Sequence, residues 1–181
     1  AQPAGSNQNV EVLLDGQSLG TYSPPAAVNT SGTPLQSALS FDGRTNFVSL
    51  PSSGMSSFTN GFTASVWAKT SAVGNHSRYF DFGDGPFKDS IVLSRDGTSN
   101  NLRLTVYRDG QDRVLYANGA IQLDTWQHFS VTITSSGVAT IYVNGVAAAT
   151  ASNGGFIPRA INRPNCFLGK STNTTNDALF Q

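Results

Sequence analysis

Apolar residues recur at every second position in several short runs of this chain. In the longest run, residues 62–69, Phe62, Ala64, Val66 and Ala68 alternate with polar residues and one tryptophan. Shorter runs with the same period occupy residues 79–82, 102–107, 128–133 and 140–143. Alternate side chains of a strand lie on one face of a sheet. No run keeps helical periodicity over three turns, so the chain is predicted to be all-β.

Turn dipeptides separate these runs at regular intervals. Asp-Gly or Asn-Gly pairs begin at Asp42, Asp84, Asp96, Asp109 and Asn144. Because such pairs accept the positive φ angles of tight turns, the pairs at Asp109 and Asn144 predict hairpins. Many short strands with turn signals at this spacing are typical of a sandwich or barrel, and no crossover helix is available for a parallel fold.

The chain is predicted to form one domain over residues 1–181, with residues 1–9 as a flexible end. A first strand is expected over 10–14 and another over 38–41. Between them, residues 21–35 are rich in Pro, Ser and Thr, which predicts a loop.

The charge balance excludes two classes of partner. Lys plus Arg number 11 and Asp plus Glu number 11, and no run of like charge occurs. Nucleic acids and anionic membranes require a basic surface, so neither is an expected partner. No apolar run approaches the roughly 20 residues that span a bilayer, so membrane insertion is not expected. The single cysteine, Cys166, excludes an internal disulfide and is predicted to be a buried core residue.

The composition favours a secreted or cell-surface protein. Only 12% of the residues are charged, so solubility depends on Ser, Thr, Asn and Gly. Residues 1–6 resemble a mature end left after removal of a signal peptide. Three triplets match the N-glycosylation pattern, at Asn29, Asn75 and Asn173.

Four stretches of the sequence, taken in order, resemble the conserved stretches of a known family. They are residues 38–51, 62–69, 126–145 and 167–170, which contain ALSFDG and FVSLP, FTASVWAK, WQHFSVT and IYVNG, and FLGK. Together they resemble the laminin-G-like family of concanavalin A-like jelly rolls. The resemblance implies an antiparallel two-sheet jelly-roll β-sandwich with one concave outer face. It is specific for the fold and nearly silent on the ligand.

The end of the sequence departs from this family. Its members usually finish with a strand similar to Gly-x-Ile-Asp-Asp-Val-Arg-Ile-Tyr, whereas this sequence stops at residues 177–181, where that strand would begin. Two explanations stay open: truncation or cleavage, or a last strand supplied by an edge-strand partner. The second would make the chain a structural subunit. A further alternative is an accessory domain of a secreted glycosidase.

Catalysis is not expected, although the same sandwich carries glycosidases. Those enzymes need two carboxylates about 5–10 Å apart. The only glutamate is Glu11, and most aspartates lie in turns, where hydrogen bonding to the backbone explains them. No nucleophile elbow accompanies His76 or His128. The chain is therefore expected to bind a partner without transforming it.

Sugar binding on a sandwich needs aromatic rings for stacking and polar groups for the hydroxyls. The predicted ligand-binding residues are Tyr79, Asp81, Arg103, Tyr107, His128 and Tyr142. Their tyrosines alternate out of the predicted core, although exposed tyrosines also pair across strands for stability. Trp67 and Trp126 are expected to have packing roles. The expected partner is a glycan or an extracellular protein.

Calcium is the only cofactor expected. It takes about six to eight oxygen ligands, which loops supply readily. The resemblance allows a calcium site, because many relatives carry one near the rim. The candidate ligands are Asp15, or Asp81, Asp84 and Asp89 in and beside the loop at 81–89. The alternative is that these aspartates only form turns.

Overall fold

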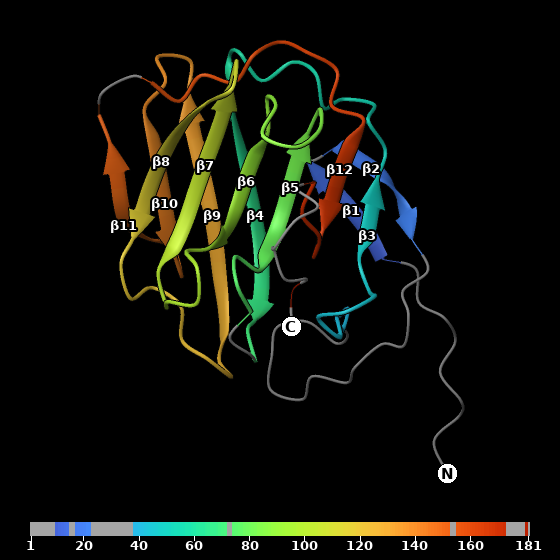
Figure 1. The fold of residues 1–181 in the computed structure, drawn as a ribbon, viewed down its shortest axis with the longest axis vertical. Coiled ribbons are helices and arrows are strands. Elements are labelled where there is room, and N and C mark those ends of the chain that lie inside the picture. Colours follow the sequence, from blue (N-terminus) through green and yellow to red (C-terminus); the bar gives the residue numbers. More distant parts are fainter. Residues whose placement is uncertain are drawn as a thin grey trace.

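Two antiparallel sheets lie one in front of the other in this computed structural model (Figure 1). The structure describes residues 10–14, 17–22, 38–71, 74–152, 155–172 and 180. In hydrogen-bonded order, the six-stranded sheet contains β3 (Val48–Leu50), β12 (Asn165–Leu168), β5 (Arg78–Gly83), β6 (Ile91–Arg95), β7 (Leu102–Arg108) and β8 (Gln111–Ala117). The four-stranded sheet contains β11 (Val146–Ala151), β10 (Ala139–Val143), β9 (Trp126–Thr134) and β4 (Gly61–Lys69). A separate antiparallel pair consists of β1 (Val10–Leu14) and β2 (Gln17–Tyr22).

The all-β two-sheet sandwich predicted from the period-two pattern is confirmed. Within the described ranges the chain forms strands and turns and no helix. This part of the chain therefore has no apolar helix of the length needed to cross a membrane.

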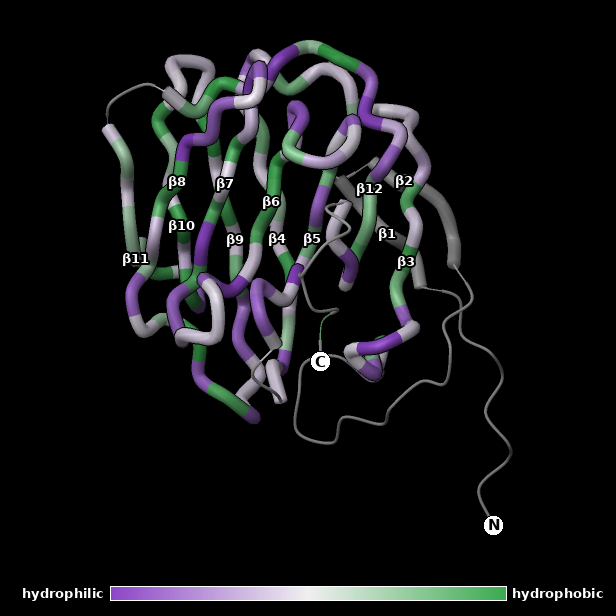
Figure 2. The backbone as a smooth tube through the Cα atoms, in the orientation of Figure 1, coloured by the Kyte–Doolittle hydropathy of each residue, from purple (hydrophilic) through white to green (hydrophobic). Residues whose placement is uncertain are grey.

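The core lies between the two sheets and consists of the alternating apolar residues. Phe62 is 5% exposed, and Leu104 and Val131 are 0% exposed. Figure 2 shows polar and apolar positions following one another along the strands. Fully burying one such side chain contributes about 1.5–3 kcal/mol, so burial of these rows holds the sheets together.

Both predicted hairpins are confirmed. The β7–β8 turn places Asp109 at φ 51° and Gly110 at φ 75°, and the β10–β11 turn places Asn144 at φ 51° and Gly145 at φ 81°. Two successive positive φ angles match the right-handed twist of the flanking strands, which is why these dipeptides fix the register of each hairpin.

One extra residue in β5 changes the phase of that strand. The register between β5 and β6 shifts between Arg78 and Phe80, which leaves Tyr79 as the bulged residue. Tyr79 is only 4% exposed and packs against Phe129, with ring centroids 5.1 Å apart. The prediction that Tyr79 points out of the core is therefore wrong, because simple alternation does not anticipate a bulge.

The burial of Tyr79 has an electrostatic consequence. Its hydroxyl lies 2.9 Å from the Thr70 hydroxyl. Desolvation raises the pKa of Tyr79 to about 12, so the phenol is protonated at neutral pH.

The N-terminal region differs from the prediction in two places. The strand expected over 10–14 is present as β1, but β2 includes Thr21 and Tyr22, which were assigned to a loop. The strand expected over 38–41 is wrong, since only Ala38 makes a single bridge. Directly after this stretch, the Asp42 carboxylate accepts the backbone N–H groups of three of the next four residues, which holds the chain in a turn before β3.

Candidate binding faces of the sandwich

The predicted ligand-binding residues do not form one platform. Arg103 and Tyr107 alternate with core residues of β7, so they lie on the outer side of the six-stranded sheet, called here the six-stranded face. His128 and Tyr142 alternate with core residues of β9 and β10 and lie on the opposite side, the four-stranded face. The core therefore separates the two pairs.

Four residues form a line across the six-stranded face. Arg78 pairs with Ser94, Ser94 pairs with Arg103, and Arg103 pairs with Tyr116, on β5, β6, β7 and β8. We call this line the arginine row. Neighbouring strands lie about 4.8 Å apart, so each side chain is beside the next. The row places two guanidinium groups on either side of a buried hydroxyl.

Arg103 has few partners within the described structure. Its Nη2 atom lies 3.8 Å from Asp112 Oδ2, and its guanidinium carbon lies 6.0 Å from the centroid of the Tyr116 ring. Its Nε atom is buried and has no hydrogen-bond partner among the described residues. Tyr116, which is 42% exposed, was missed by the sequence prediction although it alternates with core residues of β8.

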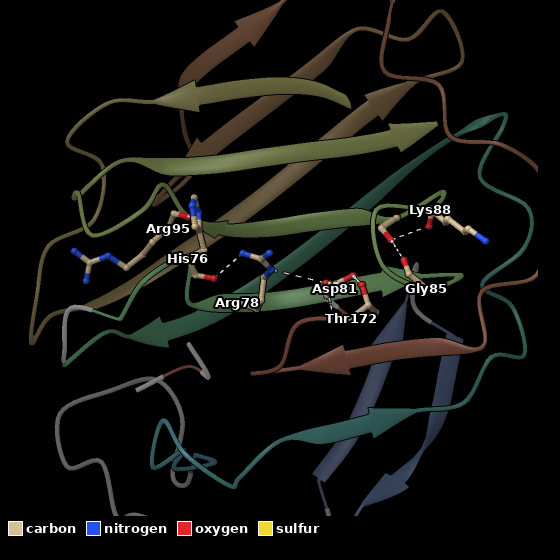
Figure 3. A network of polar contacts seen from close by, with 8 residues as sticks. His76, Arg78, Asp81, Gly85, Lys88, Arg95 and Thr172 are labelled. Atoms are coloured by element: carbon tan, nitrogen blue, oxygen red, sulfur yellow. Dashed lines mark hydrogen bonds and ion pairs between the residues drawn. The ribbon is translucent and has the colours of Figure 1, made fainter. Parts of the chain in front are cut away.

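Two further aromatic rings meet at the loop end of this face. Phe87, 52% exposed, packs edge-on against Tyr107 with ring centroids 5.7 Å apart. Phe87 has a φ angle of 56°, which is uncommon for a residue other than glycine. The loop that holds it is closed by Ser90, whose hydroxyl donates to the Lys88 carbonyl at 2.9 Å (Figure 3). No sequence pattern pointed to Phe87.

Asp81 is bound from several sides by other parts of the chain. Its Oδ2 atom accepts the Thr172 N–H at 2.9 Å and lies 3.8 Å from Arg78 Nε (Figure 3). Arg78 Nη1 in turn donates to the His76 carbonyl at 2.6 Å. Asp81 is 0% exposed. These hydrogen bonds hold the chain at Thr172 against β5, so Asp81 has a structural role.

Arg163 supports the loops beside Phe87. It is 0% exposed, and its guanidinium donates to four backbone carbonyls, those of Met55, Asp89, Arg159 and Ile161. Burial lowers the pKa of Arg163, while nearby carboxylates oppose that change. Three segments distant in sequence are thereby joined at one end of the sandwich.

Cys166 lies in the core as predicted. It is 1% exposed, and its thiol donates to the Arg163 carbonyl at 3.2 Å. Burial raises the pKa of the Cys166 thiol to about 12, so the group is not a thiolate at neutral pH.

The four-stranded face carries hydroxyl groups and one exposed indole. Across its strands, four threonines pair in register: Thr63, Thr132, Thr140 and Thr150. Trp67 is 40% exposed and lies 5.3 Å from the His128 ring, measured between centroids. Trp67 thus packs against a neighbouring ring on the outer face and not in the core, because its position in β4 directs it away from the core.

Comparison with known proteins gives the family. A family model described as the concanavalin A-like lectin/glucanase superfamily matches residues 42–181. The chain belongs to this superfamily. No curated protein matches its sequence.

Solved structures share the concanavalin A-like fold at low sequence identity. Domain 4 of AbnA, an extracellular GH43 arabinanase of Geobacillus stearothermophilus in complex with arabinotriose, has a TM-score of 0.62 and 17% identity, with 88% of this chain and 73% of that chain covered. The CBM40 domain of the Ruminococcus gnavus IT-sialidase, bound to α2,3-sialyllactose, has a TM-score of 0.56 and 16% identity over 65% and 68%. Domains LG4–5 of the mouse laminin α1 chain have a TM-score of 0.50 and 12% identity over 67% and 32%. These likenesses concern the fold.

Three of the candidate calcium ligands of this concanavalin A-like domain lie in the described structure, and they do not form a group there. Both Asp81 oxygens accept hydrogen bonds from Thr172, and Asp84 is exposed. Asp89 lies 3.6 Å from Arg159 Nη1 through one oxygen, while its other oxygen is buried without a hydrogen-bond partner in the described structure. The described ranges contain no group of three or more His, Cys, Asp or Glu residues with metal-ligand spacing. Asp15 lies outside the described residues.

Calcium binding therefore stays a prediction with a simple test. A site that binds only the native state raises the melting temperature through mass action. Thermal unfolding in EDTA and in millimolar calcium should differ if the site exists, and coincident transitions would contradict it.

One of the three predicted glycosylation sites can be placed. Asn75 is exposed in a turn before β5, where its side chain is accessible. Asn29 and Asn173 lie outside the described residues, as do residues 177–179 and 181 of the end compared with the family's last strand.

Proposed function

We propose that this concanavalin A-like domain is a noncatalytic module of a secreted or cell-surface protein, and that it binds carbohydrate on its six-stranded face. The observation that carries the proposal is the arrangement of that face, where exposed aromatic rings lie beside the charged and hydroxyl groups of the arginine row. Sugar rings present apolar C–H groups to aromatic faces and hydroxyls to polar side chains, so both kinds of group are needed. Two solved structures with this fold contain bound oligosaccharides, which supports carbohydrate as the class of ligand.

The acidic residues of this face favour binding without hydrolysis. Asp81 lies on β5 and Asp112 on β8, three strands apart. Their backbones are therefore separated by about 14 Å, from a strand spacing of about 4.8 Å. Glycosidase carboxylates lie about 5–10 Å apart, and the contacts of Asp81 with Thr172 and Arg78 further oppose a catalytic role.

A glycan array with single variants tests the proposal. Tyr107→Ala and Tyr116→Ala should each weaken binding about tenfold, because each removes a ring that can pack on a sugar. Tyr142→Ala is the matched control, since it removes a tyrosine from the four-stranded face. Equal losses in all three variants would contradict the choice of face, and the absence of any glycan ligand would contradict carbohydrate recognition.

Protein recognition on the four-stranded face is the second candidate. It is favoured by Trp67, whose exposed indole offers a large apolar contact with a polar tip. In this case Trp67→Ala would abolish partner capture while Tyr116→Ala leaves it unchanged. The opposite pattern would support the first candidate.

A further inference from the structure

The Arg103 guanidinium meets fewer hydrogen-bond acceptors of the chain than the guanidinium groups of Arg95 and Arg163 do. Arg95 and Arg163 each donate several hydrogen bonds to chain carbonyls. Arg103 has a buried Nε–H group without an acceptor in the described structure, and only 17% of its side chain is exposed. A buried donor without a partner costs about 1–3 kcal/mol, so its position needs an explanation.

The contact with Asp112 does not supply that explanation. The two groups are 3.8 Å apart at their nearest atoms, beyond hydrogen-bond length, and 51% of the Asp112 side chain is exposed. An ion pair with one solvated partner contributes about 0–1 kcal/mol. The carboxylate also meets Nη2 and leaves the Nε edge of the guanidinium without an acceptor among the described residues.

The surroundings of Arg103 restrict which ligand groups could accept a hydrogen bond from its guanidinium. The guanidinium carbon lies 6.0 Å from the centroid of the Tyr116 ring, so the cation and the ring are close enough for one sugar unit to contact both. Ser94, in the next position of the arginine row, is 1% exposed. Two adjacent guanidinium N–H groups match the two oxygens of a carboxylate better than they match a single hydroxyl.

We propose that the six-stranded face is selective for acidic saccharides. In this proposal the Arg103 side chain turns outward, which exposes Nε, and binds the sugar carboxylate through Nε and one Nη while the sugar ring packs against Tyr116. The proposal rests on carbohydrate recognition by this face and adds the ligand class. A sulfate ester offers a related anion that a guanidinium can also bind through two oxygens. We assign the carboxylate, and the ligand series below separates the two anions.

Matched ligands test the assignment. Titrations with a glucuronic acid disaccharide, its glucose counterpart and its 6-sulfated glucose counterpart should give the order acidic, sulfated, neutral. Arg103→Gln should weaken binding of the uronic ligand at least about tenfold and change binding of the neutral one less than about twofold, as expected for a charge-assisted hydrogen bond. Arg108→Gln, which removes an exposed arginine from the end of the same strand, is the matched control and should change neither.

A direct readout follows Arg103 itself. In ¹H–¹⁵N spectra of arginine side chains, the Nε–H signal missing from Arg103→Gln identifies this residue. That signal should move downfield with the uronic ligand and stay in place with the neutral one. Equal movement with both ligands, or none with either, would overturn the assignment.

The failures of the two proposals are distinguishable. Equal affinity for uronic and neutral ligands, lost in Tyr116→Ala, would refute acidic selectivity and leave carbohydrate recognition intact. Absence of binding to every glycan would refute both, and stronger binding of the sulfated ligand would refute the carboxylate. If Arg103→Gln does not fold, Asp112→Asn keeps Arg103 and removes a competing carboxylate; it should strengthen uronic binding about threefold or more, and weaker binding would contradict the proposal.

Discussion

On the four-stranded face, two neighbouring hydroxyl groups bond to one another. On the six-stranded face, charged groups from separate strands meet, and the Nε atom of Arg103 lacks an acceptor within the described structure. The Thr140 and Thr150 hydroxyls are 3.2 Å apart, and Trp67 packs beside His128. Arg103, by contrast, has an unmatched donor beside an exposed ring. Both faces are polar, so polarity alone does not identify a binding surface. The informative difference is whether the chain itself matches the hydrogen-bonding groups it presents.

The largest effect on stability is expected at Arg163, which supports one end of the six-stranded face and donates no hydrogen bond to the four-stranded face within the described residues. Arg163→Met leaves four carbonyls without their donor, two of them in buried contacts, and should lower the free energy of unfolding by about 3 kcal/mol or more. Urea denaturation measures the loss. Hydrogen exchange should increase at residues 84–90 while β9 and β10 remain protected. Uniform loss of protection across both sheets would mean that the two faces are not independent.

The next effect on stability concerns β5, which is buried on both sides, and its neighbour β12. The pKa of Tyr79 is raised to about 12 and that of Cys166 also to about 12, so folding favours their neutral forms. The stability they confer is present below the unfolded pKa values, about 10 and 9, and is lost as the pH rises towards 12. For Tyr79 the two-unit shift corresponds to about 2–3 kcal/mol. Tyr79→Phe should flatten the alkaline decline of stability, and an unchanged decline would contradict this account.

Phe87 should show opposite effects on stability and binding. Phe87→Gly relieves a left-handed backbone conformation, with a net gain of up to about 1 kcal/mol after the added entropy of the unfolded chain. The same variant removes the ring beside Tyr107 and should weaken glycan binding. Chemical denaturation and titration measure the two quantities. Destabilisation together with unchanged affinity would assign the ring to packing.

The smallest effect is expected on the four-stranded face. Thr140→Val removes one exposed hydroxyl contact with Thr150 and should change stability by less than about 0.5 kcal/mol. Glycan affinity should not change. A measurable loss of affinity would show that both faces take part.

The sequence predicted the sandwich because its evidence is local. Burial of Phe62, Leu104 and Val131 and the turns at Asp109 and Asn144 depend on period and on dipeptide conformation, which are visible in single segments. The outward direction of Arg103 and Tyr107, and of His128 and Tyr142, was predictable for the same reason.

The assignment of those residues to faces was not predictable. Alternation predicts that a side chain points away from the core, but it does not predict to which sheet the strand belongs. Sheet membership depends on the pairing of β7 with β6 and of β10 with β9. Tyr79 was misplaced by a bulge, and Arg163 gave no signal because its acceptors are carbonyls of loops distant in sequence. Phe87 depends on a loop conformation that propensity does not specify.

The bulge at Tyr79 also constrains how this strand can change through insertion and deletion. Loss of that one residue would restore strict alternation and keep Arg78 opposite Ser94, but it would remove from the core the ring that packs against Phe129. Length variation is therefore expected in the turns of related chains rather than at this point in β5.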